Sequence, residues 1–170
     1  MMILISLVFC SKKNSTKPEA LAPEDLLPKD NELSGWTCTG EFWTAKSGSE
    51  LSSYINGAAA LYVNYGFVEC AAQVYEGPVL ETVEKVQLLI FDQGKLDNTR
   101  SLFDEYIRQM NNPIDWKEAG TEARIERFPL SQMITFYRSK YFVSLTITSG
   151  LDESLEVLKQ FAKNVDSKIK

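Results

Sequence analysis

The first residue with an evident chemical role is Cys10, which follows a short apolar run from Ile3 to Phe9. Leu7 stands three residues before it, where the cleavage site of a bacterial lipoprotein signal usually has Leu. In such a protein the signal is removed just before the cysteine, whose thiol is then acylated. The run is too short to span a bilayer as a helix, which takes ~20 residues, but it suits the apolar part of an export signal. The pattern predicts an export signal over 1–9 and lipidation of Cys10.

Two features differ from an ordinary signal of this kind. Phe9 precedes the cysteine where a small residue is usual, and no Lys or Arg precedes the apolar run. The alternative is a mildly apolar N-terminus with a chance cysteine. The lipoprotein interpretation is favoured by residues 11–16, a small, polar and basic stretch of the kind that separates a domain from a membrane. Prolines in 17–29 disfavour a helix there, so we expect a tether and linker over 10–32.

Cys38 and Cys70 are the other two cysteines. In an oxidising, exported compartment such a pair can form a disulfide. Two free thiols, packed as small apolar groups, are the alternative. Nothing in the sequence has the spacing of a metal-ligand set, and we expect no cofactor.

The chain contains no histidine. This removes the commonest general base, Ser-His-Asp and Cys-His catalysis, and most zinc sites. An enzyme with this sequence would have to use groups such as carboxylates, for example two in one cleft acting on a cell-wall or other polysaccharide. Asp92 and Asp97 flank the start of a predicted helix, where their common role is to complement the helix dipole.

The composition is that of a folded domain, with 44% hydrophobic and 24% charged residues. The residues after the linker suffice for a sizeable core, and we expect one globular domain over 33–170. The formal net charge of −5 repels phosphates, so we expect no nucleic-acid partner.

Hydrophobic periodicity predicts an α+β fold, in which a mainly antiparallel sheet of about five to six strands packs with three helices. The expected order is β-α-β-β-α-β-β-β-α. Strand patterns occupy 39–44, 67–76, 82–91, 123–128, 132–138 and 141–148, and helical patterns occupy 51–62, 96–111 and 151–165. Gly77-Pro78 should end the second strand. The last strand alternates apolar and polar residues, which is typical of a strand with one wet face.

The most unusual local sequence is Tyr54-Ile-Asn56-Gly57, inside the first helical pattern. It predicts either one helix with a weak point or two short helices. As a functional site, the turn would offer an amide and free backbone groups to a ligand. The structural alternative is a helix break in which Asn56 bonds its neighbours and Gly57 permits close packing. Trp43 and Trp116, the latter expected in a loop, could stack on a ligand, although aromatic residues more often fill cores. The possible ligand or turn residues are Tyr54, Asn56, Gly57, Asp92 and Trp116.

Several segments resemble an uncharacterised bacterial family of exported proteins, a domain of unknown function. They are Leu27-Pro28, Gly35-Trp36, Tyr54 to Ala58 and Tyr65-Gly66-Phe67. The family also has a strand ending in Tyr-Asp-Met-Gly, where this chain has Phe91-Asp92-Gln93-Gly94. The resemblance covers roughly residues 27–103. It implies an exported α+β domain and no particular activity.

These observations predict an exported bacterial lipoprotein, anchored through Cys10 on the periplasmic or cell-surface side of a membrane. The expected function is a binding or interaction module at the cell envelope, for an unknown protein or small ligand. The alternative is the carboxylate-dependent enzyme considered above.

Overall fold

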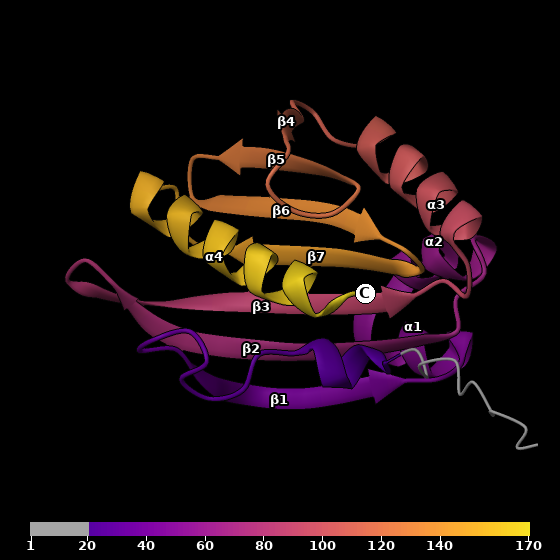
Figure 1. The fold of residues 1–170 in the computed structure, drawn as a ribbon, viewed down its shortest axis with the longest axis horizontal. Helices are drawn as coiled ribbons and strands as arrows, with labels where there is room; N and C mark the ends of the chain where they lie inside the picture. Colours follow the sequence, from indigo (N-terminus) through magenta and orange to yellow (C-terminus); the bar gives the residue numbers. More distant parts are fainter. Residues whose placement is uncertain (1–20) are drawn as a thin grey trace, which may run out of the picture.

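The computed structural model describes residues 21–170. One antiparallel sheet of seven strands runs through it in the order β1-β2-β3-β7-β6-β5-β4 (Figure 1). The strands are β1 (Thr37–Ala45), β2 (Glu69–Val79), β3 (Thr82–Asp92), β4 (Ile114–Trp116), β5 (Glu122–Phe128), β6 (Ser131–Arg138) and β7 (Tyr141–Ile147). The helices are η1 (Pro23–Leu26), α1 (Gly48–Ile55), η2 (Asn56–Ala58), α2 (Ala59–Asn64), α3 (Leu96–Arg108) and α4 (Asp152–Lys168).

The α+β class, the antiparallel sheet and the three helical regions are confirmed. The number of strands is corrected from five or six to seven, because the short edge strand β4 lies between α3 and β5. The first helical region is divided into α1, η2 and α2, which is the second of the two alternatives that the sequence left open. No helix within residues 21–170 is long and apolar enough to cross a membrane.

The β2–β3 hairpin is longer than expected, because Gly77-Pro78 does not end the second strand. β2 continues to Val79, and the chain turns at Leu80 with a φ of 53°. Gly77 has a different role within the strand. A Cβ at this position would lie 2.4 Å from Cδ2 of Trp36, so the absence of a side chain lets the indole pack directly on the strand backbone.

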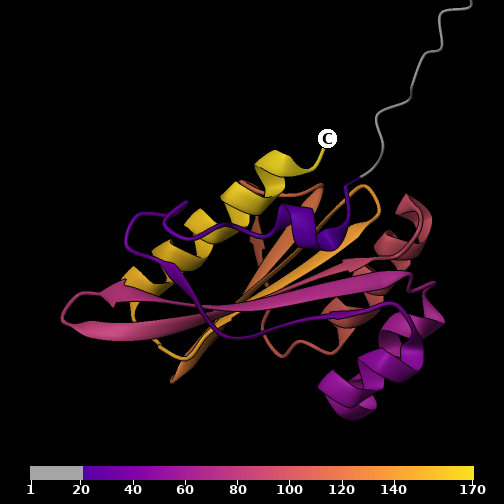
Figure 2. The same ribbon diagram turned by 90° about the horizontal axis from the view of Figure 1, so that it is seen from below.

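One face of the sheet, here the α4 face, is covered by α4 and by residues 21–36, here the N-terminal segment (Figures 1 and 2). Trp36 meets Phe161 of α4 edge to face, with ring centroids 5.3 Å apart. Leu26 is fully buried in the same core. The linker predicted over 10–32 is therefore corrected, because its C-terminal part is packed on the sheet. The helix there is limited to the single turn η1, which begins at Pro23 and ends before Pro28. The leucines between these prolines, Leu26 and Leu27, still bury apolar surface.

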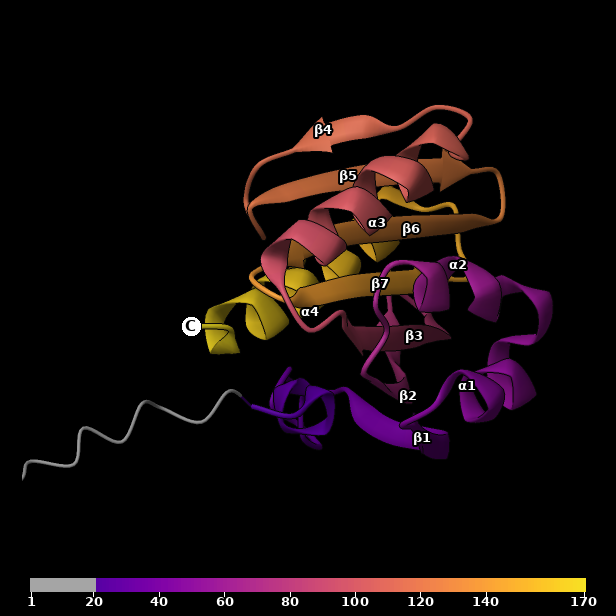
Figure 3. The same cartoon turned by 90° about the vertical axis from the view of Figure 1, so that its right-hand side faces the viewer.

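The opposite face, here the α1–α3 face, is covered by α1, α2 and α3, which gather at one end of the sheet (Figures 2 and 3). Tyr62 of α2 stacks on Phe91 of β3, with ring centroids 3.9 Å apart. Phe142 and Ser144 of β7 are buried under this layer. The expectation of a wet face on the last strand is therefore wrong, because helices cover this central strand on both sides.

Candidate functional site

Trp43 and Tyr54 form a partly exposed aromatic pair where β1 meets α1. Their rings are parallel within 2°, with centroids 4.2 Å apart. Tyr54 is 43% exposed, while Trp43 packs partly against the core of the α1–α3 face. Stacked aromatic pairs of this kind contribute about 0.5–1.5 kcal/mol beyond the area that they bury. The pair is thus held in place and still presents ring surface to solvent.

Ser47 fixes the start of the helix that positions Tyr54. Its Oγ accepts a hydrogen bond from the N–H of Glu50 at 3.3 Å, and the Glu50 carboxylate accepts one from the N–H of Lys46 at 2.6 Å. Ser47 and Glu50 have the spacing of a capping box, although the Glu50 carboxylate accepts from the N–H of Lys46 and not from that of Ser47. Leu51 is fully buried on the inner side of α1. Three residues later, Tyr54 lies at the rim over Trp43.

The turn that follows contains a strained residue, Asn56. It has a φ of 51° and a ψ of −138°, a conformation that residues with a side chain rarely adopt. Such strain costs on the order of 1–3 kcal/mol and is concentrated at functional sites. Within residues 21–170, the Asn56 side chain forms no hydrogen bond. Its amide is therefore free, and residues 56–58 are all exposed.

Gly57, unlike Asn56, has an unstrained backbone conformation in this turn. Its φ is not positive, and a Cβ added to it would meet no atom within 4 Å. The structural alternative from the sequence does not describe this turn, because Asn56 does not bond its neighbours and Gly57 does not permit a close contact. Instead, the turn offers an unpaired amide and small residues next to the aromatic pair.

Asp92 lies apart from this corner, at the end of β3, and is 5% exposed. It forms an ion pair with Lys140, and its Oδ1 accepts a hydrogen bond from the N–H of Gly94 at 2.7 Å. Burial alone would lower the pKa of Lys140, but the hydrogen bond and charge of Asp92 outweigh burial and raise it. Both carboxylate oxygens thus have partners within the protein, and Asp92 fixes the turn between β3 and α3.

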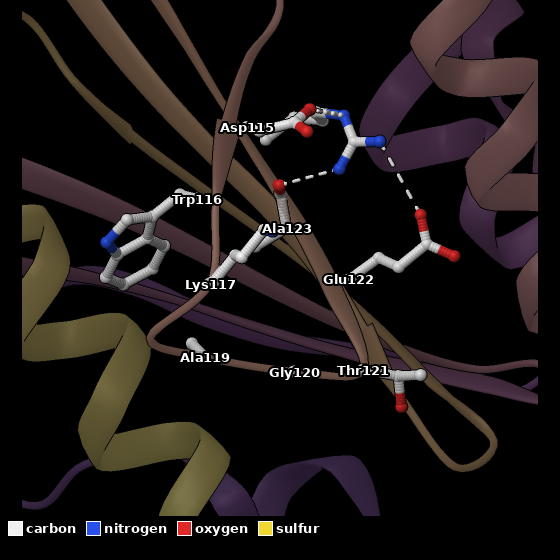
Figure 4. Close-up of a pocket in the computed structure, with 9 residues that line it drawn as sticks. Asp115, Trp116, Lys117, Ala119, Gly120, Thr121, Glu122 and Ala123 are labelled. Atoms are coloured by element: carbon white, nitrogen blue, oxygen red, sulfur yellow. Dashed lines mark hydrogen bonds and ion pairs between the residues drawn. The ribbon is translucent and has the colours of Figure 1, made fainter.

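Trp116 lies in β4, which corrects the expectation of a loop. It pairs with Ala123 of β5, and its indole lies on the side of α4 and is 8% exposed (Figure 4). The indole N–H donates to Glu118 at 3.4 Å. Trp116 is therefore part of the core of the α4 face. A strand of only three residues is too short for an alternating pattern, so the sequence could not indicate β4.

A cavity of about 250 Å³ lies at the β4–β5 loop (Figure 4). Arg124 bridges two carboxylates there, with its Nε 3.1 Å from Asp115 and its Nη2 3.5 Å from Glu122. The side chains of Asp115 and Glu122 are 70% and 39% exposed. A general acid that works near neutral pH relies on burial in an apolar pocket. The geometry therefore favours a structural charge cluster over an acid–base pair.

The structure does not bring Cys38 and Cys70 together, and both thiols are free. Cys38 pairs with Tyr75 in the β1–β2 register, whereas Cys70 pairs with Ala45. Tyr75 lies five positions along β2 from Cys70, which is about 16 Å at the rise of a strand. A disulfide needs Cα atoms within about 7 Å. The predicted disulfide is therefore corrected to an exposed thiol and a buried one. Cys10 lies outside the described residues.

Of the predicted ligand residues, the structure brings Tyr54, Asn56 and Gly57 together and leaves Asp92 and Trp116 elsewhere. Sequence reasoning considered Trp43 as an aromatic residue but did not pair it with Tyr54. The pairing depends on how α1 packs against the edge of β1, eleven residues apart in the sequence, and no local pattern indicates it.

Comparison with protein-family models finds no match, and no curated protein matches the chain. Among solved structures, the fold is similar to the crystal structure of the extracellular domain of PknH from Mycobacterium tuberculosis. The TM-score is 0.51, the sequence identity is 10%, and the match covers 88% of this chain and 99% of that one. At this identity, the similarity concerns the fold alone.

Proposed function

We propose that this chain is an exported bacterial lipoprotein, anchored through Cys10, that serves as a binding module at the cell envelope. The apolar run before Cys10 supports export and anchoring. The fold that the chain shares with an extracellular domain is compatible with that location. The ligand is a protein or a small molecule of the envelope, bound at the corner formed by Trp43, Tyr54 and the turn 56–58.

The observation that supports this site best is the aromatic pair beside the strained, exposed turn. Tyr and Trp are enriched among the residues that dominate binding energy. A residue other than Gly in the conformation of Asn56 costs folding free energy, and the unpaired Asn56 amide provides no compensating hydrogen bond within residues 21–170. A ligand that accepts or donates a hydrogen bond at this amide would account for both features.

Site-specific photo-crosslinking in cells tests the binding surface. A photoreactive amino acid placed at position 57, where an added Cβ meets no atom within 4 Å, keeps Asn56 in place. It should give a crosslinked product of defined mass, and Tyr54→Ala should abolish that product. The matched control places the same amino acid at Gln160, which is exposed on α4 on the other side of the sheet. Identical products from both positions, or none from position 57, would count against this surface.

Intact mass and membrane fractionation test the anchor. The wild-type chain should be found in the membrane fraction, with a mass increased by acyl chains, and Cys10→Ala should lose both properties. Cys38→Ala serves as the matched control, because it removes an exposed thiol outside the signal. If Cys10→Ala and Cys38→Ala behave alike, the anchoring proposal fails, whatever the crosslinking shows.

A further inference from the structure

A second cavity, of about 420 Å³, lies between the N-terminal segment and the strands β1 and β2. Its volume falls within the ~300–1,000 Å³ typical of small-molecule sites. The polar residues around it that matter here are Glu24, Asp25, Lys29, Asp30, Cys38 and Gln73. It lies on the α4 face, on the other side of the sheet from the aromatic pair.

Gln73 places a hydrogen-bond acceptor at the cavity. The residue is only 7% exposed. Its Nε2 donates to two backbone carbonyls, that of Thr39 at 2.9 Å and that of Val74 at 2.8 Å. Because both amide hydrogens are used, the orientation of the amide group is determined. Its Oε1 has no donor among residues 21–170, so a buried side chain that lines the cavity has an acceptor without a partner.

Carboxylates contribute most of the charge at this cavity. Three of them, from Glu24, Asp25 and Asp30, line the cavity against one ammonium group, that of Lys29. Asp30 accepts a hydrogen bond from the N–H of Cys38 at 2.6 Å, which fixes its position at the strand. Burial, together with the hydrogen bond and charge of Asp30, raises the pKa of the Cys38 thiol. The cavity therefore has a negative potential, and its thiol is kept protonated.

The arrangement does not suit a metal ion. Within residues 21–170, no group of three or more His, Cys, Asp or Glu side chains lies close enough together to hold one. A ligand that satisfies separated acceptors must instead have several N–H donors on an extended stem. Apolar surface for such a stem is available, because Leu27 and Pro28 also line the cavity.

We propose that this cavity binds an organic cation, an alkylammonium or guanidinium group whose N–H donors reach Gln73 Oε1 and the carboxylates of Glu24 and Asp30. Such a group combines hydrogen bonds with charge, which makes the bonds stronger than neutral ones. The source is either a small amine or the side chain of a basic residue in a partner. This site is independent of the corner at Tyr54.

The test is a titration of the ¹⁵N-labelled chain, followed through the backbone amide signals of Cys38 and Gln73. The probes are cadaverine, the peptides acetyl-Gly-Lys-Gly-amide and acetyl-Gly-Arg-Gly-amide, the neutral peptide acetyl-Gly-Gln-Gly-amide, and Mg²⁺. The cations should give saturable shifts with a Kd in the millimolar range or below, and the neutral peptide should give none. Tighter binding of cadaverine would indicate a small amine, and tighter binding of a peptide would indicate a protein side chain.

Two variants remove charge without removing a structural bond. Glu24→Gln changes an exposed side chain, and Asp30→Asn retains an oxygen acceptor for Cys38. Each should weaken cation binding by about three- to fivefold. Glu81→Gln, an equal change of charge at the exposed β2–β3 turn, should leave it unchanged. The proposal is overturned if no cation gives saturable shifts, if the neutral peptide gives the same ones, or if Mg²⁺ gives them at lower concentration.

Discussion

Replacing Gln93 by Met should stabilise the protein. Gln93 follows β3 and has no exposed surface, and neither its Nε2 nor its Oε1 has a hydrogen-bond partner within residues 21–170. Its backbone is satisfied, because its N–H donates to the carbonyl of Lys140 at 2.8 Å and its carbonyl accepts from Asn98 at 2.8 Å. The unfavourable contribution therefore comes from the side-chain amide alone. A buried polar group without a partner costs about 1–3 kcal/mol.

Met has a similar length and no polar hydrogen-bonding demand. We expect Gln93→Met to raise the free energy of unfolding by about 2 kcal/mol, and the Tm by about 4–8 °C for a domain of this size. Urea denaturation followed by circular dichroism measures the first quantity, and a thermal melt measures the second.

Gln132 provides the matched control, because it is also fully buried. Its Nε2 donates to the carbonyl of Ser149 at 3.1 Å and to that of Leu151. Like the Gln93 amide oxygen, Gln132 Oε1 has no partner within residues 21–170, but Gln132→Met also leaves two backbone carbonyls without their donor. This second effect should dominate and lower the free energy of unfolding by about 1–3 kcal/mol. If both variants are destabilised alike, the Gln93 amide has a partner in solution, and the reasoning from its unpaired atoms is refuted.

Three further predictions concern the backbone and charge. Asn56→Gly should raise the free energy of unfolding by about 1 kcal/mol, because Gly tolerates the positive φ; an unchanged urea midpoint would contradict strain at this turn. Gly77→Ala should lower the free energy of unfolding by about 2–3 kcal/mol, because the added Cβ would overlap the ring of Trp36. The same urea titration measures this change. An unchanged free energy of unfolding would show that the indole moves freely. The pKa of Glu32 is lowered: burial raises it, but hydrogen bonds, the largest from Lys168, and the charge of Lys168 outweigh burial. Stability from this contact should therefore be present above the unfolded pKa of about 4.3 and be lost as pH falls through the folded pKa. On acidification, the free energy of unfolding should accordingly fall less for Glu32→Gln than for the wild type. An equal fall in both proteins would exclude the Glu32–Lys168 contact as the cause.

The sequence predicted the elements that have strong periodicity. The stripe of α3 and the capping box at Ser47 are local patterns, and they specify local structure. The predictions were wrong where contacts between residues distant in the sequence determine the local structure. Gly77 was taken as a strand end because its local signal is a breaker, whereas its actual constraint is the ring of Trp36, forty-one residues away. Polar residues of β7 such as Ser144 suggested a solvated face, but the covering helices come from other parts of the chain.

The candidate site was predicted in part for the same reason. The sequence showed that Asn56-Gly57 interrupts a helix, because Gly is a local signal. It could not show which of the two residues would take the positive φ, since that follows from how α1 and α2 pack on the sheet. Trp43 and Tyr54 were both visible as aromatic residues, yet only the three-dimensional fold stacks one on the other.

The attachment of the N-terminal segment has a consequence for orientation. The Tyr141 hydroxyl donates to the carbonyl of Leu21, and Lys168 donates to that of Leu27 at 3.2 Å. The chain thus enters the domain near the C-terminal end of α4, away from the β2–β3 turn (Figure 1). If Cys10 is held at a bilayer, the eleven residues to Leu21 reach at most about 40 Å. The end of the domain at which the chain enters would then face the lipid, and the β2–β3 turn would point away from the membrane. There Leu80 and Val83, each 68% exposed, would be the first apolar groups that an approaching molecule meets.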